Sequence, residues 1–194
     1  MHDPKKREEG VRDGISVLLE ALAFASRKHR HQRRKDPEAS PYINHPIMLA
    51  DILWNEAGVR DLTAVVACIL HDTVEDTATT LAEIEHAFGA HIASVVAEVT
   101  DDKTLPKHVR KQLQVVHAKS ASHQAKLVKL ADKIANLRDL TTSPPASWSQ
   151  ERIAEYFEWS RSVIDALRGD HPVLEALFDE AYAHSPLHLP PEEK

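Results

Sequence analysis

The sequence predicts an all-α protein, a single helical domain within a chain of 194 residues. Glycine occurs only 5 times, whereas average usage would give about 14. Alanine, leucine and the long charged residues that favour helices dominate the chain, and no segment has the pattern of a convincing strand. A chain of this length can bury one sizeable core. These observations together predict a helical bundle.

The N-terminal half begins with two helices separated by a loop of proline and polar residues. The first helix is expected over 11–32, because Leu18 and Leu22 recur at helical spacing. Pro46 favours a first helical turn and therefore predicts a second helix over 45–56. The intervening loop contains the turn-forming residues expected between helices.

Capping signals mark the helices that follow. Asp61 is a candidate N-cap for an apolar helix that runs into His71 and Asp72. Thr80 and Glu83 have the spacing of a capping box, which predicts another helix start. The remaining helices are predicted over 81–88, 90–99, 107–118, 123–140, 149–168 and 171–183.

The overall charge and the lack of long apolar stretches argue against nucleic-acid-binding and membrane-spanning proteins. Residues 1–10 and 185–194 are expected to be disordered tails around one domain over 11–184. A net charge of −6 argues against a general nucleic-acid binder, and no apolar stretch approaches the roughly 20 residues that span a bilayer. With the lone Cys68 and no signal peptide, the sequence predicts a soluble cytoplasmic protein that binds neither nucleic acid nor membrane. The oligomeric state is left open.

The most informative segment reads HDTVED over 71–76 and follows an apolar run. Residues four apart share a face of a helix, so His71 and Asp72 would lie one turn from Glu75 and Asp76. Four ionisable groups on a buried helix are unfavourable unless they are paired or bind a metal ion. The segment therefore indicates a metal site with carboxylates that could move a proton, although Glu75 and Asp76 alone could form a solvated helix end.

Two adjacent ligands do not complete a metal site, and His45 and Asp132 are the best further candidates. His45 opens a helix, and Asp132 stands in an otherwise apolar frame. Two imidazoles and two carboxylates suit Mn²⁺, Fe²⁺ or Zn²⁺ better than Ca²⁺. Taken singly, His45 could cap a helix and Asp132 could pair with a neighbouring lysine. Most of the other histidines, His29 among them, are expected at the surface.

A basic run over 27–35 ends about ten residues before His45. Cations near a helix C-terminus are favoured by the helix dipole, so the run could be a solvated helix end. In an acidic protein, however, Arg33, Arg34 and Lys35 concentrate positive charge close to the predicted metal site. Such a cluster indicates phosphate recognition.

In combination, these motifs resemble the hydrolase domain of the RelA/SpoT proteins, within the HD phosphohydrolase superfamily. More closely, they are similar to the stand-alone small alarmone hydrolases of the metazoan SpoT type. The similarity covers residues 15–180. The segments that carry it are RRKDP (33–37), PYINHP (41–46), LHDTVEDT (70–77), VTDDK (99–103), KLVKLADK (126–133) and EYFEW (155–159).

The resemblance implies hydrolysis of the 3′-pyrophosphate of ppGpp and pppGpp, giving GDP or GTP and pyrophosphate. It implies one Mn²⁺ ion, with Fe²⁺ or Zn²⁺ as substitutes. The implied metal ligands are His45, His71, Asp72 and Asp132. Glu75 and Asp76 would orient and deprotonate the attacking water. The implied substrate contacts are Arg34, Lys35, Lys107, Asn136, Arg152 and Tyr156.

The metal centre leaves other functions open. Metazoan relatives are also associated with removing the 2′-phosphate of NADPH, which likewise presents a phosphorylated ribose hydroxyl. A general nucleotidase acting on 5′-monophosphates is a broader alternative, although the basic segment before His45 argues mildly against it. A receptor without turnover would be expected to have damaged ligand or acid positions, and none is damaged here.

Overall fold

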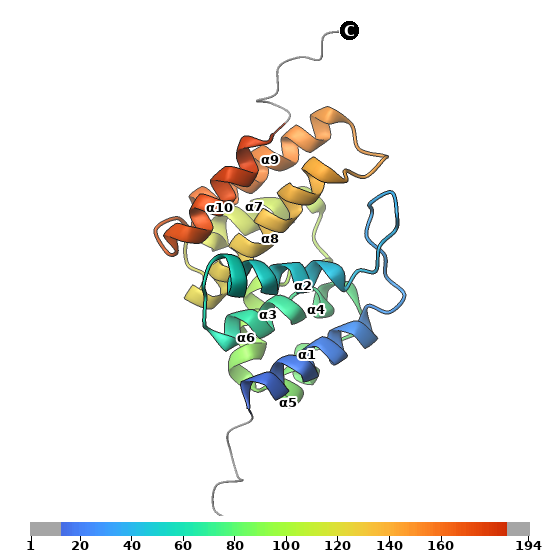
Figure 1. Ribbon diagram of the computed structural model, residues 1–194, viewed down its shortest axis with the longest axis vertical. Coiled ribbons are helices and arrows are strands. Elements are labelled where there is room, and N and C mark those ends of the chain that lie inside the picture. The colour runs from blue at the N-terminus through green and yellow to red at the C-terminus, as the bar shows by residue number, and fades with distance from the viewer. Residues whose placement is uncertain (1–12, 186–194) are drawn as a thin grey trace, which may run out of the picture.

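The computed structural model describes residues 13–185, which fold into helices joined by short loops (Figure 1). In chain order the helices are α1 (Gly14–Lys28), α2 (Asn44–Asp51), the π-helix η2 (Ile52–Glu56), α3 (Leu62–Leu70), α4 (Thr73–Asp76), α5 (Leu81–Phe88), α6 (Ala90–Val99), α7 (Lys107–Ala118), α8 (His123–Thr142), α9 (Gln150–Asp165) and α10 (Pro172–Ala183). Within 13–185 there is no strand, only one β-bridge between Arg33 and Pro41. The predicted all-α fold is confirmed. The tails predicted at 1–10 and 185–194 lie outside the described residues, apart from Ser185, which is buried.

Helices α3 and α8 form the centre of the core. Every residue of α3 from 64 to 70 is buried, and the helix packs against α1, α2, α6 and α8. Helix α8 also contacts α2, α6, α9 and α10. Because both helices are enclosed, polar side chains that they carry or that directly follow them lie inside the molecule. A polar group in such a place needs a partner or a ligand.

The HDTVED segment differs from the continuous helix that its spacing suggested. Helix α3 ends at Leu70, and His71 and Asp72 form a turn before the short helix α4. The hydroxyl of Thr73 donates a hydrogen bond of 2.6 Å to the Leu70 carbonyl, a local side-chain bond that competes with helix continuation. The spacing argument assumed that His71 and Glu75 share one helix, and this assumption is wrong.

The first helix is shorter than predicted. It ends at Lys28, where His29 caps it by donating its backbone N–H to the Ala25 carbonyl. The chain then turns into the bridge between Arg33 and Pro41, so most of the basic run lies on a loop. The helix predicted over 45–56 is present, but its last turn is the π-helix η2.

The predicted caps are present. Asp61 caps α3 through a bond of 3.1 Å from the Ala64 N–H. Thr80 and Glu83 form both bonds of a capping box at the start of α5.

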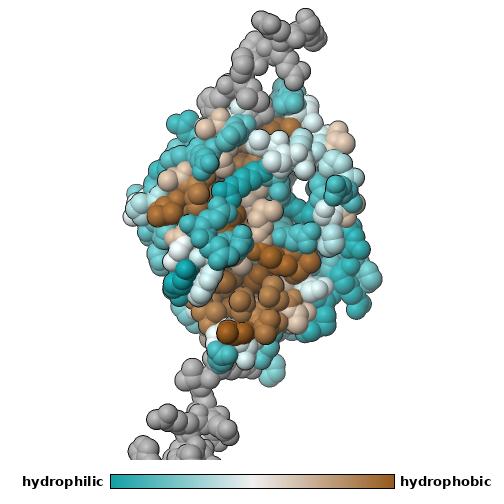
Figure 2. All heavy atoms as spheres, viewed as in Figure 1, coloured by the Kyte–Doolittle hydropathy of each residue, from teal (hydrophilic) through white to brown (hydrophobic). Residues whose placement is uncertain are grey.

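On the face shown in Figure 2, an apolar area lies in the lower half of the view, near α1 and α2, and hydrophilic residues surround it. Helix α1 buries small residues such as Ala21 and Ala25 against α3, while Ile15 and Leu19 are exposed. Among the described residues, no helix has the length and apolar character needed to cross a membrane.

Candidate metal centre and active site

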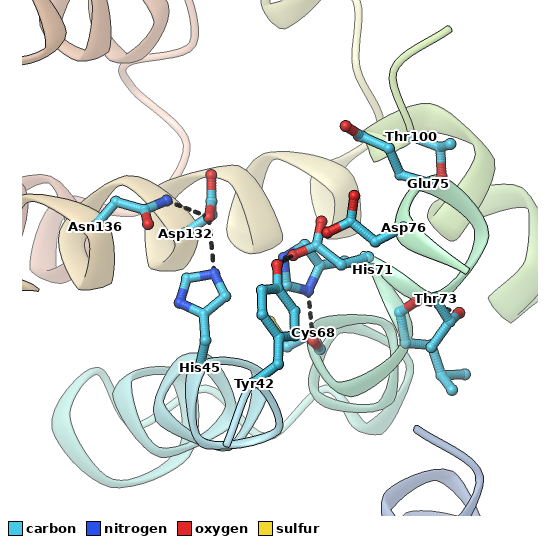
Figure 3. Close-up of polar contacts among 12 residues, drawn as sticks. Tyr42, His45, Cys68, His71, Thr73, Glu75, Asp76, Thr100, Asp132 and Asn136 are labelled. Atoms are coloured by element: carbon cyan, nitrogen blue, oxygen red, sulfur yellow. Dashed lines mark hydrogen bonds and ion pairs between the residues drawn. The ribbon is translucent and has the colours of Figure 1, made fainter. Parts of the chain in front are cut away.

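Three of the four predicted metal ligands meet in the structure. His45 lies on α2, and His71 directly follows α3 (Figure 3). Asp72 completes the turn between α3 and α4. One potential ligand atom from each lies within 4.8 Å of the others. The two imidazoles are only 3% and 6% exposed. A buried group of this composition can bind a metal ion.

A hydrogen bond to the backbone fixes the orientation of the His71 ring. Its Nδ1 lies 2.8 Å from the Cys68 carbonyl, and because a carbonyl only accepts, Nδ1 must be the protonated nitrogen. Nε2 is buried, has no hydrogen-bond partner among residues 13–185, and lies 2.9 Å from Asp72 Oδ2. When Nε2 is deprotonated, an imidazole held in this way would offer the lone pair of that nitrogen to a metal ion, as metal-bound histidines do.

Asp132, the fourth predicted ligand, lies beside this group on α8. Its Oδ1 is 3.3 Å from His45 Nε2 and accepts a hydrogen bond of 2.6 Å from Asn136. Its Oδ2 pairs with Lys133 at 2.9 Å. Asp132 is not one of the three residues that form the compact group. The ion pair with a neighbouring lysine, which the sequence left open, is therefore formed.

The charged groups of the site stabilise one another in their ionised forms. Burial lowers the pKa of His71, but the charges of Asp72 and Asp132 outweigh burial and raise it to about 9. Burial raises the pKa of the Asp72 and Asp132 carboxyl groups, but nearby positive charge outweighs burial. His71 lowers the pKa of Asp72 below its usual range, and Lys133 lowers that of Asp132. The site thus combines ionised carboxylates with imidazoles, a donor set that suits a divalent transition metal.

Tyr42 is a member of the site that sequence reasoning missed. Its hydroxyl donates a hydrogen bond to Asp72. Its ring lies beside His45 (Figure 3), edge-on and with centroids 6.0 Å apart. Burial and the charge of Asp72 raise the pKa of Tyr42 far above its usual value, so it remains a donor. Tyr42 belongs to the PYINHP segment, but no local pattern showed which residue it contacts.

The two predicted acids have different surroundings. Glu75 accepts a hydrogen bond of 3.1 Å from the backbone N–H of Asp101, which lies on the loop after α6. Its other oxygen is 3.6 Å from Arg110. Burial, together with the negative charges of Asp72 and Asp101, raises the pKa of Glu75, although the Asp101 N–H opposes the shift. The raised pKa makes the ionised Glu75 carboxylate a stronger proton acceptor than an ordinary glutamate.

Polar partners on two segments hold the Asp76 carboxylate in place. It accepts from Gln32 at 2.8 Å and pairs with Lys103. Gln32 is in turn fixed by His29, whose Nδ1 lies 2.7 Å from the Gln32 side-chain oxygen. His29 is only 2% exposed, so the expectation that it lies at the surface is wrong. The buried position of His29 was not visible in its charged sequence context.

Four of the predicted substrate contacts line one large cavity of about 710 Å³ beside the metal group. They are Arg34, Lys35, Asn136 and Tyr156. His45 also lines this cavity. Arg34 is held by an ion pair with Asp139. The cavity adjoins a second one, of about 370 Å³, which contains the whole metal group and Glu75.

The other two predicted substrate contacts, Lys107 and Arg152, line a neighbouring cavity. Lys107 lines both the metal cavity and a neighbouring cavity of about 270 Å³. Arg152 lines only the neighbouring one, where its guanidinium lies 4.2 Å from the centre of the Trp148 ring. The structure therefore brings Lys107 to the metal cavity but leaves Arg152 beside it.

Comparisons with known proteins agree on one family. The HD domain model matches residues 21–158. The guanosine-3′,5′-bis(diphosphate) 3′-pyrophosphohydrolase MESH1 of Homo sapiens is 60% identical over 158 residues, covering 81% of this chain and 88% of that protein. MESH1 of Xenopus tropicalis is 53% identical over 167 residues, or 86% and 93% of the two chains. A solved structure described as a metazoan orthologue of SpoT that hydrolyses ppGpp is 44% identical and superimposes with a TM-score of 0.86, covering 92% of this chain and 99% of that one.

Proposed function

This chain belongs to the HD domain family and is similar over most of its length to the MESH1 hydrolases, and we propose that it removes the 3′-pyrophosphate of ppGpp and pppGpp. The resemblance seen in its motifs is thereby confirmed. One observation carries the proposal. A buried group of metal-binding residues and a carboxylate of raised pKa share a cavity, and that cavity adjoins a larger one with basic side chains.

The proposed reaction is a hydrolysis at the phosphorus bonded to the ribose 3′-oxygen. The oxygen of water forms a bond to that phosphorus, and the bond between phosphorus and the 3′-oxygen breaks. One proton of the water is taken by a base, and the 3′-oxygen gains a proton as it leaves. The products are GDP or GTP and inorganic pyrophosphate.

His45, His71, Asp72 and Asp132 would hold a divalent ion, for which we propose Mn²⁺, with Fe²⁺ or Zn²⁺ as substitutes. His71 Nε2, which is buried without a hydrogen-bond partner among the described residues and faces Asp72, supports this assignment. When bound, such an ion stabilises negative charge on phosphoryl oxygens and makes water more acidic. Tyr42 would keep Asp72 in position through its hydrogen bond.

Glu75 is proposed as the base that takes the proton of the attacking water. It lines the same cavity as the metal group, and its raised pKa brings its basicity closer to that needed at moderate pH. Asp76, fixed by Gln32 and Lys103, would orient the water.

The basic side chains of the large cavity would hold the nucleotide. Arg34 and Lys35 offer positive charge to phosphates. Asn136 and Tyr156 offer hydrogen bonds and an aromatic surface to the ribose and base. Lys107 and Arg152 would reach phosphates farther from the metal.

The lone cysteine, Cys68, is buried and free, which suits a reducing compartment, and we expect the reaction in the cytoplasm.

The test is a turnover assay with ppGpp and NADPH side by side, in Mn²⁺ and after chelation. We expect Mn²⁺-dependent release of GDP and pyrophosphate from ppGpp, with slower turnover of NADPH. The His71→Ala variant should be inactive in the same assay. Faster release of phosphate from NADPH would replace the proposed substrate, and turnover that persists after chelation would contradict the metal-dependent chemistry.

A further inference from the structure

The metal cavity extends past Glu75 to a wall that the proposed chemistry does not use. At one end it shares Arg34, Lys35 and Tyr156 with the large nucleotide-sized cavity. At the other end it shares four residues with a further cavity of about 440 Å³. These four are Asp101, Arg110, Gln114 and Lys129. None of them lines the large cavity, so the metal group lies between the two ends.

Lys129 is a largely buried cation that forms no direct ion pair. It is 7% exposed and lies on α8, one turn before Asp132 and Lys133 and on the same face. Within residues 13–185, its ammonium group takes part in no hydrogen bond and no ion pair, although Asp132, Asp101 and Glu75 attract it from a longer distance. Burial and the charge of Lys133 lower its pKa, and the three carboxylates oppose that shift. An anion that enters this end of the cavity would form the direct ion pair that these carboxylates do not form.

Arg110 lies on α7 in the same wall and also has unused donors. Its Nε is buried without a hydrogen-bond partner among the described residues. Its Nη1 lies 3.6 Å from Glu75 and 3.7 Å from Asp101, longer than hydrogen bonds. Gln114 holds the Asp101 carboxylate by a bond of 2.8 Å. A guanidinium can bind a phosphate through two parallel hydrogen bonds, and Arg110 retains the capacity to do so.

We propose that Lys129 and Arg110 bind the outer phosphate of the 3′-pyrophosphate, on the side of the metal group opposite the nucleotide. This inference rests on the proposed function. The outer phosphate lies one P–O–P linkage beyond the reacting phosphorus and leaves as part of the product pyrophosphate. A single phosphate on the ribose has no group to reach this subsite. Lys129 therefore sets a preference for a pyrophosphate over a monophosphate.

The test compares ppGpp with the same nucleotide bearing a single 3′-phosphate, using the full chain in Mn²⁺. Lys129→Met preserves length while removing the charge. We expect it to lower kcat/KM for ppGpp by about 10- to 100-fold, the loss of a charged hydrogen bond. Its effect on the monophosphate should be about threefold or less. The exposed Lys119→Met is the matched control, in which both values should remain unchanged.

Two further measurements separate a subsite from a structural role. Inorganic pyrophosphate should inhibit Lys129→Met less strongly than the unmodified protein, whereas inorganic phosphate should inhibit both equally. Lys129→Arg should restore part of the preference for ppGpp. If Lys129→Met leaves the ratio of kcat/KM for ppGpp to that for the monophosphate unchanged, the Lys129 subsite is wrong, while the proposed function remains intact. Absence of ppGpp turnover in the unmodified protein would instead contradict the proposed function, and the subsite with it.

Discussion

Glu75 and Asp76 are neighbours in sequence, yet they differ in what surrounds them. Glu75 lies among the negative charges of Asp72 and Asp101 and is largely buried, which favours its protonated form. Asp76 faces Gln32 and Lys103, which hold its carboxylate in place. Two adjacent carboxylates can therefore have separate roles, one as a base and one as an orienting group.

Replacing Glu75 by glutamine should remove the proposed base while keeping the shape of the side chain. We expect kcat for ppGpp to fall by about 10²- to 10⁴-fold, the usual contribution of a general base. The metal content, measured by elemental analysis, should remain at the level of the unmodified protein. The exposed Glu85→Gln serves as the matched control and should keep full activity. Near-normal turnover in Glu75→Gln would refute its assignment as the base.

The pH profile should show the raised pKa of Glu75. A base acts only when it is ionised, so kcat should decline as the pH falls through that pKa. Because burial raises the pKa above the ordinary value of 4.5, the decline should begin at a higher pH than for an exposed glutamate. Measuring kcat at saturating Mn²⁺ and ppGpp across the acidic range checks this expectation. A profile that stays flat down to the ordinary value would argue against it.

Tyr42 should act through Asp72 rather than on the substrate. Tyr42→Phe removes the hydroxyl that donates to Asp72 but keeps the aromatic ring beside His45. Groups that orient a metal ligand usually change metal affinity by about 10- to 100-fold, so we expect a comparable rise in the Kd for Mn²⁺. At saturating Mn²⁺, kcat should largely recover. Tyr182→Phe removes a hydroxyl bonded to Glu158, on a different helix pair, and should leave the Kd unchanged.

At the scale of the elements, the break between α3 and α4 decides how the site is built. A continuous helix would direct His71 and Glu75 along one face, whereas the turn at His71 and Asp72 separates them. Helix α8 adds Asp132 and Asn136 from the opposite side, at the helical spacing of four residues. The site is therefore assembled from a turn and two helices, α2 and α8, that pack against each other.

Thr73 stabilises this break, and its replacement tests the break directly. Thr73→Val is close in shape but loses the hydroxyl that bonds the Leu70 carbonyl in a fully buried position. We expect the free energy of unfolding to fall by about 1–3 kcal/mol, because a buried carbonyl loses its donor. Thr142→Val removes a similar bond to Arg138 at the exposed end of α8. In urea denaturation it should cost less than about 0.5 kcal/mol.

At the scale of the whole molecule, an acidic chain surrounds a cavity with many cationic side chains. The net charge is −6, while Arg34, Lys35, Lys107, Arg110, Lys111, Lys129 and Lys133 all line the metal cavity. Positive charge gathered in a cleft attracts anionic ligands even when the net charge is negative. The distribution of charge, rather than its sum, is what suits a polyphosphorylated nucleotide.

Metal binding should stabilise the whole fold, because the ligands come from α2, the turn after α3, and α8. A ligand that binds only the folded state at 100 times its Kd adds about 2.7 kcal/mol to the free energy of unfolding. We therefore expect Mn²⁺ to raise the Tm in thermal unfolding and a chelator to reverse the rise. His71→Ala should abolish this shift. An unchanged Tm in the unmodified protein at saturating Mn²⁺ would contradict the metal centre.

The sequence by itself determined the helical class, most helix boundaries and the residue types of the site. Helix α7 begins and ends where the pattern predicted, and the capping box at Thr80 and Glu83 formed as expected. These features depend on interactions between residues up to four positions apart, which a sequence displays directly. The HDTVED segment was informative for the same reason, since its four ionisable residues are close neighbours in the chain.

Only the tertiary structure decided which distant groups meet. It placed Asp132 beside His45, Tyr42 on Asp72, and His29 in the interior behind Asp76. It also ended α3 before His71, through a side-chain bond that competes with the helix. Contacts of this kind depend on how whole helices pack, and the packing of α2, α3 and α8 is set by the burial of all their apolar faces together. No local pattern contains that information.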